Sequence, residues 1–418
     1  MSANEQNRAV SIVQRIEQLA SITEESGCVT RTYGTPAFVK GAQLVQEWMK
    51  AAGLETRIDA IGNVRGRWNS GKANAKTLVL ASHIDTVVNA GKYDGPLGVI
   101  MAIDLIEQLK SKKAVLPFHI EIIAFSDEEG VRFHTTFLGS QVVTGAFNKD
   151  WLQKKDANGI SLEEAMKVFG GSPDQLSKDA IPANEWLGYF EMHIEQGPVL
   201  YNQQIPVAVV TSIAGQKRIT VTLRGFAGHA GTVPMDMRSD ALCAAADCIL
   251  AIETFATGQK HRLVATVGTI QIPHGASNVI PGEVRFTIDI RSSDNQYLAE
   301  ATASVKTICE ELVMKRMVSM DWQLVQETAP VAADPHLTET LRKAITGSQF
   351  PVVELVSGAG HDAVPVSQVA PVSMMFIRCY KGISHHPQEH AEVGDIASAI
   401  VVADQFLEGL IQHYSSLS

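Results

Sequence analysis

Acidic and imidazole side chains follow four apolar, strand-like segments of the sequence. These residues are His83 and Asp85 after "TLVLAS" (77–82), Asp127, Glu128 and Glu129 after "FHIEIIAF" (118–125), His193 and Glu195 after "GYFEM" (188–192), and His385 after "PVSMMFIRC" (371–379). Asp94 lies in the loop that follows the first of these segments. Clustered carboxylates are costly to desolvate unless a cation faces them, and open α/β sheets bind ligands beyond the carboxyl ends of their strands. We therefore expect these residues to meet at one edge of a sheet.

Taken singly, a histidine at a strand end is more often structural than a ligand, and an acidic pair there is more often solvated. Together, imidazoles and carboxylates are the ligand set of zinc or manganese, and more than four of them favour two ions that share a bridging carboxylate. Asp85 lies two residues beyond His83 on an extended segment, so it can orient the His83 imidazole. If the chain turns at Gly130, one of Glu128 and Glu129 can bind a metal while the other acts as general base.

The segments that must position these residues alternate between strand-like and helical patterns. Helical spacing marks "SIVQRIEQLASI" and "GAQLVQEWMKAAGL" between residues 11 and 50, and "GPLGVIMAIDLIEQLKS" after the first strand. "VVELVS" (352–357) adds a further strand. This alternation predicts an α/β fold, with a large, doubly wound mixed sheet and helices on both faces.

Residues 213–330 carry a different order of elements. A strand "KRITVTLRG", a helix "DALCAAADCILAIETFA", strands "LVATVGTIQI" and "VRFTIDIRS", a helix "YLAEATASVKTICEELV" and a strand "SMDWQLVQE" follow one another. This β-α-β-β-α-β order is the ferredoxin-like unit. We therefore expect a larger catalytic domain, 1–212 with 331–418, interrupted by a smaller α+β domain, 213–330.

Length and charge exclude several classes of partner. A chain of 418 residues normally forms more than one domain, and 45% hydrophobic with 19% charged residues is typical of a globular protein. With a formal net charge of -10 and no basic run, neither a nucleic acid nor an acidic membrane is expected as a partner. Because no apolar run reaches membrane-spanning length and no signal peptide is apparent, we expect a small-molecule substrate and a cytoplasmic location.

The cysteines suggest neither a disulfide framework nor a thiolate zinc site, because the five of them are scattered and never form a C-x-x-C pair. We interpret them as small buried hydrophobes. A nucleophilic Cys379, which closes an apolar strand near histidines, is the less favoured alternative.

Eight motifs in this order resemble a known family. They are "SHIDTV…YDGPLG", "SDEEGVRF…GS", "MHIEQG", "GHAGTVPM.MRSDA", "SNVIPG", "IDIRS", "SGAGHDA" and "GISHHPQEH", and the resemblance runs from about Tyr33 to the C-terminus. Together they resemble the allantoate amidohydrolases and N-carbamoyl-L-amino acid hydrolases, which are related to dinuclear aminoacylases and carboxypeptidases. Related peptidases commonly have a carboxylate at the position of His193, so "HIEQG" favours the carbamoyl-cleaving branch.

The resemblance implies a centre of two divalent cations, manganese or zinc. The implied ligands are His83, the bridging Asp94 and His193 for one cation, and Asp94, Glu129 and His385 for the other. Glu128 is implied as the general base. Two cations would offset the carboxylates of "SDEEG" and so explain an acidic strand end in a core.

The resemblance also implies substrate contacts and a homodimer. The implied residues are His229 for the oxyanion, Arg291 for a substrate carboxylate, Arg218 as a second cationic contact, Asn278, and Gln196, Gly360 and His361 for the ureido end and the pocket wall. His229 and Asn278 are implied to come from a partner subunit through the small domain. Judged without the family, "GHAG" and "SNVIPG" are also compatible with simple turns, and Arg291 with an exposed strand-end residue.

The implied reaction converts allantoate to ureidoglycine, ammonia and CO2, a step in nitrogen recycling from purines. Arg218 favours allantoate over the alternative, an N-carbamoyl-L-amino acid, because a second cation suits a substrate rich in acceptors. A noncatalytic metal-bound module is disfavoured, since the base and both ligand sets are intact. A metallopeptidase would cleave a dipeptide and release no ammonia from a ureide.

Overall fold

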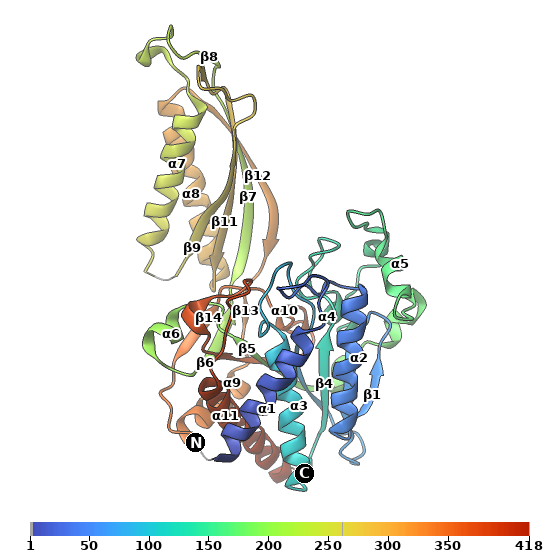
Figure 1. Ribbon diagram of the computed structural model, residues 1–418. Helices are drawn as coiled ribbons and strands as arrows, with labels where there is room; N and C mark the ends of the chain where they lie inside the picture. Colours follow the sequence, from blue (N-terminus) through green and yellow to red (C-terminus); the bar gives the residue numbers. More distant parts are fainter. Residues whose placement is uncertain (1–2, 261, 418) are drawn as a thin grey trace. The chain divides into compact units, whose positions relative to one another are not determined.

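The computed structural model describes residues 3–260 and 262–417, which form two compact units (Figure 1). The larger unit comprises 3–211, 333–355 and 360–417, and the smaller unit comprises 212–332 and 356–359 with His261 outside the described residues. The sequence pattern predicts residues 356–359 in the larger domain. They belong to the smaller unit because the Ala214 N–H donates to the carbonyl of Ser357 (2.8 Å) and Arg291 donates to the carbonyl of Gly358 (2.5 Å).

The main sheet is mixed and has nine strands. They are β1 (Glu55–Ile58), β2 (Val64–Trp68), β3 (Thr77–His83), β4 (His119–Phe125), β5 (Trp186–Ile194), β6 (Val207–Ile213), β13 (Val331–Ala332), β14 (Glu354–Ser357) and β15 (Val372–Ile377). The order is β1-β2-β4-β3-β5-β15-β6-β13, with β14 beside β6. The central strands β4, β3, β5 and β15 are parallel, whereas β2 is antiparallel to β4 and β6 is antiparallel to β15. Every residue of β3, β4 and β15 is buried, which accounts for their continuous apolar sequences.

Helices cover this sheet. They are α1 (Ala3–Ala20), α2 (Pro36–Ala51), α3 (Pro96–Ser111), α4 (Leu138–Val143), α5 (Leu162–Lys167), α6 (Val199–Gln203), α9 (Pro335–Gly347), α10 (Ala363–Val366) and α11 (Val393–Ser416). Short 3-10 helices are η1 (Lys149–Gln153), η2 (Pro173–Lys178), η3 (Ala183–Glu185), η4 (Met235–Met237, in the smaller unit) and η5 (Tyr380–Gly382). α1, α3 and α11 lie side by side (Figure 1). No helix among the described residues is long and apolar enough to cross a lipid bilayer.

The strand β5 shows how the sheet separates its core from its site. Successive side chains of a strand point to opposite faces. Phe190 stacks on Phe406 of α11 at 4.2 Å between ring centroids, so this face is packed by helices. His193 contacts the ring of His361, which directly precedes α10, at 4.7 Å. The same strand therefore supplies a core residue to one face and site residues to the other.

The smaller unit has the predicted β-α-β-β-α-β order. Its elements are β7 (Gly215–Arg224), α7 (Ala241–Thr257), β9 (Val264–Gln271), β11 (Glu283–Ser292), α8 (Asn295–Lys315) and β12 (Ser319–Thr328), with a short pair β8 (Gly228–His229) and β10 (Val279–Ile280). The antiparallel sheet has the order β12-β7-β11-β9. A separate apolar core lies between this sheet and the two helices, and it includes Val221, Cys248 and Val305.

The predicted mixed α/β fold is confirmed, although β1, β2, β6 and β13 are not among the predicted strands. β2 is not predicted because it contains two arginines, Arg65 and Arg67, and arginines are typical of solvent-exposed segments. Arg65 is 5% exposed, and its Nε donates to Oε1 of Glu121 on the neighbouring strand (2.6 Å), while Arg67 donates to Oε2 (3.1 Å). A buried ion pair thus replaces the apolar pattern on which a strand is recognised.

Candidate metal centre

The residues expected at the metal centre follow neighbouring strands of the main sheet. β3 ends with His83, β5 carries His193 one residue before its end, and Glu128 and Glu129 follow β4. Because β4, β3 and β5 are parallel neighbours, their carboxyl ends lie at the same edge of the sheet. This edge therefore brings imidazoles and carboxylates from distant parts of the sequence together.

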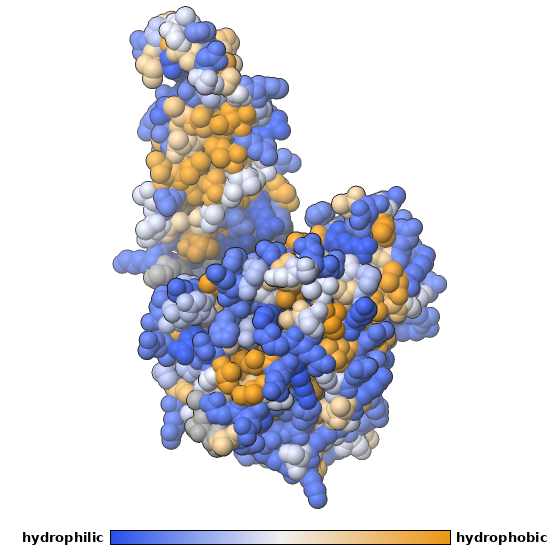
Figure 2. Space-filling view, in the orientation of Figure 1, coloured by the Kyte–Doolittle hydropathy of each residue, from blue (hydrophilic) through white to orange (hydrophobic). Residues whose placement is uncertain are grey.

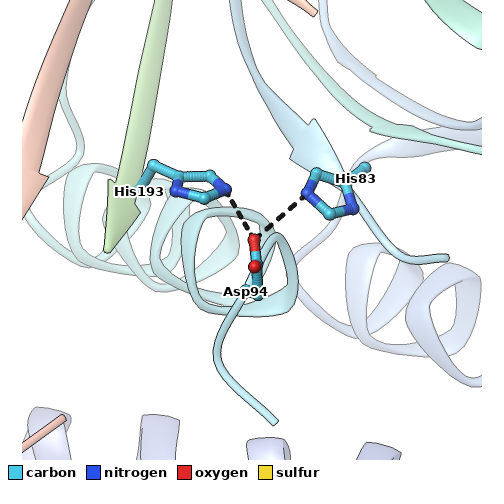
Figure 3. Close-up of side chains that lie close together, drawn as sticks. All are labelled: His83, Asp94 and His193. Atoms are coloured by element: carbon cyan, nitrogen blue, oxygen red, sulfur yellow. Dashed lines mark ion pairs between the residues drawn. The ribbon is translucent and has the colours of Figure 1, made fainter. Parts of the chain in front are cut away.

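The histidines are arranged around Asp94, which lies just before α3. Its Oδ1 is 3.6 Å from Nε2 of His83 and 3.0 Å from Nε2 of His193. Both imidazoles point at the same end of the carboxylate (Figure 3). Its Oδ2 is 3.2 Å from Nε2 of His385, which is 3.5 Å from Oε1 of Glu129. The two oxygens of Asp94 therefore face two different sets of side chains.

Both sets fit divalent cations. In His83, Asp94 and His193, and again in Asp94, Glu129 and His385, one donor atom from each residue lies within 4.8 Å of the others. Ligand atoms that bind one zinc ion at about 2.1 Å are at most about 4.2 Å apart, so only a small closure is needed. Imidazole with carboxylate is the donor set of zinc and manganese. Nearby, the Oε1 of Gln196 is buried without a hydrogen-bond partner in the described chain.

Both inner histidines are held with Nε2 toward Asp94. The Nδ1 of His193 lies 2.9 Å from the carbonyl of Ile194, and the Nδ1 of His83 lies 3.1 Å from the carbonyl of Asp85. Such acceptors keep the proton on Nδ1 and leave Nε2 free to bind a metal. The Asp85 carboxylate, expected to orient His83, is slightly farther from Nδ1, at 3.4 Å.

The Asp85 carboxylate instead makes its shorter contacts with the backbone of the acidic segment. Its two oxygens accept hydrogen bonds from the N–H groups of Glu128 (3.0 Å) and Glu129 (3.1 Å). Gly130 follows with a φ of +65°, so the chain turns there as the sequence analysis expects. The turn lets both adjacent glutamates face the centre, and one donor atom from each lies within 4.8 Å of the His83 ring.

The electrostatics of the site reflect carboxylates held out of water. Burial raises the pKa of Glu128 well above its ordinary value. Burial, followed by the charge of Asp94, raises the pKa of Glu129 to about 7. Burial would also raise the pKa of Asp94, but hydrogen bonds from His193, His385 and His83 outweigh it and hold that pKa well below its usual range. Cations would relieve the repulsion among these carboxylates.

Two glycines leave room for the site. Gly95 has a φ of +82°, and a Cβ there would lie 2.5 Å from the ring of His83. A Cβ on Gly98, in the first turn of α3, would lie 2.1 Å from the carbonyl oxygen of Met192. The motif "YDGPLG" therefore lets the Asp94 turn and α3 approach β3 and β5 closely.

Three residues assigned to the substrate lie in the larger unit. Gln196 donates from Nε2 to Oδ2 of Asp94 (2.7 Å), so it contacts the carboxylate that is expected to bridge the two cations. His361 is 2% exposed, and burial holds its pKa well below the ordinary value, so the ring is neutral. At Gly360 a Cβ would lie 3.0 Å from the Phe137 ring. Gln196 and His361 thus belong to the same cluster as the expected metal ligands.

The two arginines assigned to the substrate lie in the smaller unit and share one carboxylate. Arg291 binds Asp289 through two parallel hydrogen bonds, Nε to Oδ1 (2.8 Å) and Nη2 to Oδ2 (3.0 Å). Arg218 donates from Nε to Oδ2 of Asp289 (3.2 Å). Burial would raise the pKa of Asp289, but the hydrogen bonds from the two arginines outweigh it and lower this pKa. Asp289 is not among the predicted site residues, although it lies inside the motif "IDIRS".

His229 and Asn278 also lie in the smaller unit, on the short strand pair and beside it. His229 pairs with Val279 across β8 and β10, and the Ala230 N–H donates to the carbonyl of Asn278 (2.9 Å). The Nδ1 of His229 accepts a hydrogen bond from the N–H of Gly231 (3.0 Å), which leaves Nε2 as its second polar atom. The side chains of His229 and Asn278 are exposed.

Comparison with known proteins identifies the class. Residues 79–409 match Peptidase family M20/M25/M40. The chain belongs to this family and is a hydrolase, which confirms the resemblance drawn from the motifs.

The chain is similar over almost its whole length to enzymes of one group within that family. Allantoate deiminase 2 of Glycine max is 39% identical over 435 residues, which cover 95% of this chain and 89% of the relative. The N-carbamoyl-L-amino acid amidohydrolase of Geobacillus stearothermophilus is 36% identical over 385 residues, with 92% and 94% covered.

Solved structures of other proteins are also similar to this chain. A hydantoinase/carbamoylase family amidase from Burkholderia multivorans has a TM-score of 0.90 at 31% identity, covering 96% of this chain and 97% of that one. AtUAH in complex with (S)-hydroxyglycine has a TM-score of 0.79 at 32% identity, with 97% and 98% covered. Fold and sequence therefore point to the same enzyme group.

Proposed function

We propose that this hydrolase cleaves a ureido C–N bond of allantoate and yields ureidoglycine, ammonia and CO2. An N-carbamoyl-L-amino acid is the second candidate substrate, because relatives named for both activities match the chain over most of its length. The observation that carries the proposal is the arrangement of Asp94, whose two oxygens face separate sets of metal-binding side chains, with Glu128 beside them. Two divalent cations, manganese or zinc, are the proposed cofactors.

When bound, such cations would supply Lewis-acid polarisation of the ureido carbonyl and lower the pKa of the attacking water. Glu128 accepts a proton from that water as its oxygen forms a bond to the ureido carbon. The C–N bond to the terminal nitrogen then breaks, and Glu128 returns the proton to this nitrogen, which leaves as ammonia. The carbamate that remains loses CO2 and takes up a proton on its nitrogen, which gives the amine of ureidoglycine. His229 donates a hydrogen bond to the oxyanion that develops on the carbonyl oxygen.

The remaining proposed contacts orient the substrate. Arg291 binds the substrate carboxylate, for which a planar guanidinium is the suitable donor. Gly360 and His361 form the polar pocket wall in the larger unit, and Asn278 is a further substrate contact that is proposed to come from a partner subunit. Gln196 has a buried Oε1 that lacks a protein partner in the described chain, and a ureido N–H is a suitable donor for it. This orphaned acceptor supports a role for Gln196 at the ureido end.

Arg218 supports allantoate over a carbamoyl amino acid. It shares Asp289 with Arg291, so the smaller unit presents two guanidinium groups around one carboxylate. Two cationic groups with one counterion between them suit a substrate with many carbonyl and carboxylate acceptors. A carbamoylase needs an apolar pocket for the amino-acid side chain of its substrate. The contacts of Arg218 and Arg291 are polar and do not indicate such a pocket.

The deciding experiment is to strip the protein of metal, reload it with manganese or zinc, and measure ammonia release from allantoate. N-carbamoyl amino acids are assayed in parallel for the freed amine. Rapid ammonia release from allantoate is the expected result. Turnover of a carbamoyl amino acid without ammonia release from allantoate would favour the second candidate substrate. Cleavage of a dipeptide alone would overturn the proposal.

We also propose a homodimer formed through the smaller unit. β9 is an edge strand of its sheet, so one side of its backbone is unpaired within the described chain. Val264 on this strand is 57% exposed, and Leu250 on α7 is 62% exposed. Figure 2 shows an extended hydrophobic area over α7 and α8. Burial of this area by a second copy is the favoured explanation.

Light scattering on the purified protein tests this assembly. The parent protein is expected to be a dimer, and Leu250→Glu is expected to weaken it. Val115→Glu, at a 79% exposed valine of the larger unit, is the matched control and is expected to leave the dimer intact. A monomeric parent would contradict the dimer, and equal effects of both variants would contradict its location. A cytoplasmic location stays a prediction.

A further inference from the structure

Glu389 occupies a buried position behind the bridging carboxylate. It lies between β15 and α11 and is 3% exposed. Its Oε1 accepts hydrogen bonds from the backbone N–H groups of Tyr93 (2.7 Å) and Asp94 (3.0 Å). These bonds fix the backbone that carries Asp94, because a buried N–H without a partner costs about 1–3 kcal/mol.

The second oxygen of Glu389 is linked to the side chain of the same aspartate. Ser384 Oγ lies 3.2 Å from Oε2 of Glu389 and donates to Oδ2 of Asp94 at 2.7 Å. His385 is the next residue, and its Nε2 lies 3.2 Å from that same Oδ2. Glu389 and Ser384 therefore connect the backbone of Asp94, its carboxylate and the histidine of the second ligand set.

The segment that carries His385 has little secondary structure to hold it. No helix or strand is present between η5, which ends at Gly382, and α11, which begins at Val393. His385 itself has a φ of +54°. The histidine thus depends on side-chain contacts for its position, unlike His83 and His193, which lie on strands.

The chain also leaves room for this glutamate. A Cβ at Gly91 would lie 2.3 Å from the Cβ of Glu389, so only glycine allows the Tyr93 turn to approach it. The Tyr93 ring also packs edge-on against the ring of His390, at 5.7 Å between centroids. Residues of both segments, the one around Tyr93 and the one around Glu389, therefore shape the contact between them.

We propose that Glu389 is a positioning residue that holds Asp94 and His385 in one geometry, so that the second cation, bound by Asp94, Glu129 and His385, depends on it. The inference rests on the proposed two-cation centre and adds a residue that the ligand assignment does not contain. Outer partners of metal ligands typically contribute 10–100-fold to metal affinity.

The experiment compares cation content and affinity in the full-length protein, by elemental analysis after dialysis and by competition with a chelator. The parent is expected to hold two manganese ions. Glu389→Ala is expected to hold one, with the affinity for the second lowered at least about tenfold. Glu389→Gln is expected to restore it, because the amide oxygen can accept both N–H groups and the amide nitrogen can donate to Ser384.

Asp334→Ala is the matched control. Asp334 also accepts two backbone N–H groups, from His336 (3.0 Å) and Leu337 (2.9 Å), but at the start of α9. The Asp334→Ala substitution is expected to lower the melting temperature and to leave both cations bound. If Glu389→Ala folds poorly, Ser384→Ala keeps the Glu389 bonds to the backbone and removes the link between Glu389 and the Asp94 carboxylate, together with a longer hydrogen bond from Gln196 (3.3 Å). It is expected to weaken binding of the second cation several-fold.

Unchanged affinity in both Glu389→Ala and Ser384→Ala would overturn the inference while leaving the two-cation centre intact. Loss of the second cation in Asp334→Ala as well would also overturn it, because general destabilisation would then explain the effect. A parent that binds fewer than two cations would overturn the proposed centre and the inference with it.

Discussion

The backbone N–H of Glu128 donates to the Asp85 carboxylate at 3.0 Å. The second carboxylate oxygen of Asp85 accepts from the N–H of Glu129 at 3.1 Å. The acidic segment is therefore anchored through its backbone, and the two glutamate side chains remain available for other partners. It follows that the Glu128 side chain can be changed without releasing the segment that carries Glu129.

Replacement of Glu128 by glutamine is expected to keep both cations and to lower kcat by at least about a hundredfold, as removal of a general base does. The amide has nearly the same shape but cannot accept the proton of the attacking water. Turnover and cation content are measured on the same preparation. Glu129→Gln is the neighbouring contrast, expected to lose the second cation. Near-parental turnover of Glu128→Gln would refute its role as base.

Replacement of Gly95 by alanine is expected to disturb the first ligand set. The new Cβ would lie 2.5 Å from the His83 ring, which must then move away from Asp94. The affinity for the first cation is expected to fall at least about tenfold, as measured by competition with a chelator.

Gly71→Ala separates this clash from backbone strain. Gly71 has a φ of +75°, close to the +82° of Gly95, but a Cβ there would have no neighbour within 4 Å. It should lower stability by roughly 1–2 kcal/mol through strain and leave cation affinity unchanged. If both variants lose cation equally, the clash with His83 is not the cause.

Arg291→Lys is expected to raise KM for allantoate roughly tenfold with a smaller change in kcat, because the bidentate fork is lost while the charge remains. Arg285→Lys is the control on the same strand, since Arg285 is exposed and pairs with Glu283. Steady-state kinetics should show no change for this control. An unchanged KM for Arg291→Lys would move the carboxylate site elsewhere.

The sequence predicts that the expected ligands lie together, and the structure does place their donor atoms close to one another, because most of them lie at the end of a strand or in a glycine-marked turn. The positions of His83 and His193 follow from the parallel sheet alone. Residues that act through hydrogen bonds to backbone groups are harder to find. Glu389 contacts Asp94 across 295 positions in the chain, and only the folded structure shows which N–H groups its carboxylate receives.

Strands stabilised by ion pairs are missed for a similar reason. β2 is buried through the pairing of Arg65 with Glu121 at 2.6 Å, so its sequence lacks the apolar run that marks β3 and β4. The smaller unit is easier, because its strands alternate between buried and exposed residues, as in β11. Prediction of β2 thus fails because its burial depends on charge, whereas β6 is missed although it is apolar and largely buried.

Removal of the cations is expected to make stability fall as the pH rises. Burial and the charge of Asp94 raise the pKa of Glu129 from 4.5 to about 7. A hydrogen bond to Asp94 raises the pKa of His385 from 6.5 to about 9. A group whose pKa is higher in the folded state makes its full contribution to folding stability below its unfolded pKa. This contribution is lost as the pH rises through its folded pKa. The affected window is therefore about pH 4.5 to 9.

The melting temperatures of chelated and manganese-loaded protein should accordingly diverge with rising pH. Bound cations offset the repulsion that deprotonation creates. The difference in melting temperature between manganese-loaded and chelated protein is therefore expected to be small near about pH 6 and larger near about pH 8.5. His361 acts in the opposite sense, since its pKa is lowered by burial, but its contribution is complete once the pH exceeds its ordinary value of 6.5. Chelated Glu129→Gln should show a shallower decline than the chelated parent, because an amide has no proton to lose. A gap that stays constant across this range would show that the carboxylates of the centre are not the groups that the cations stabilise.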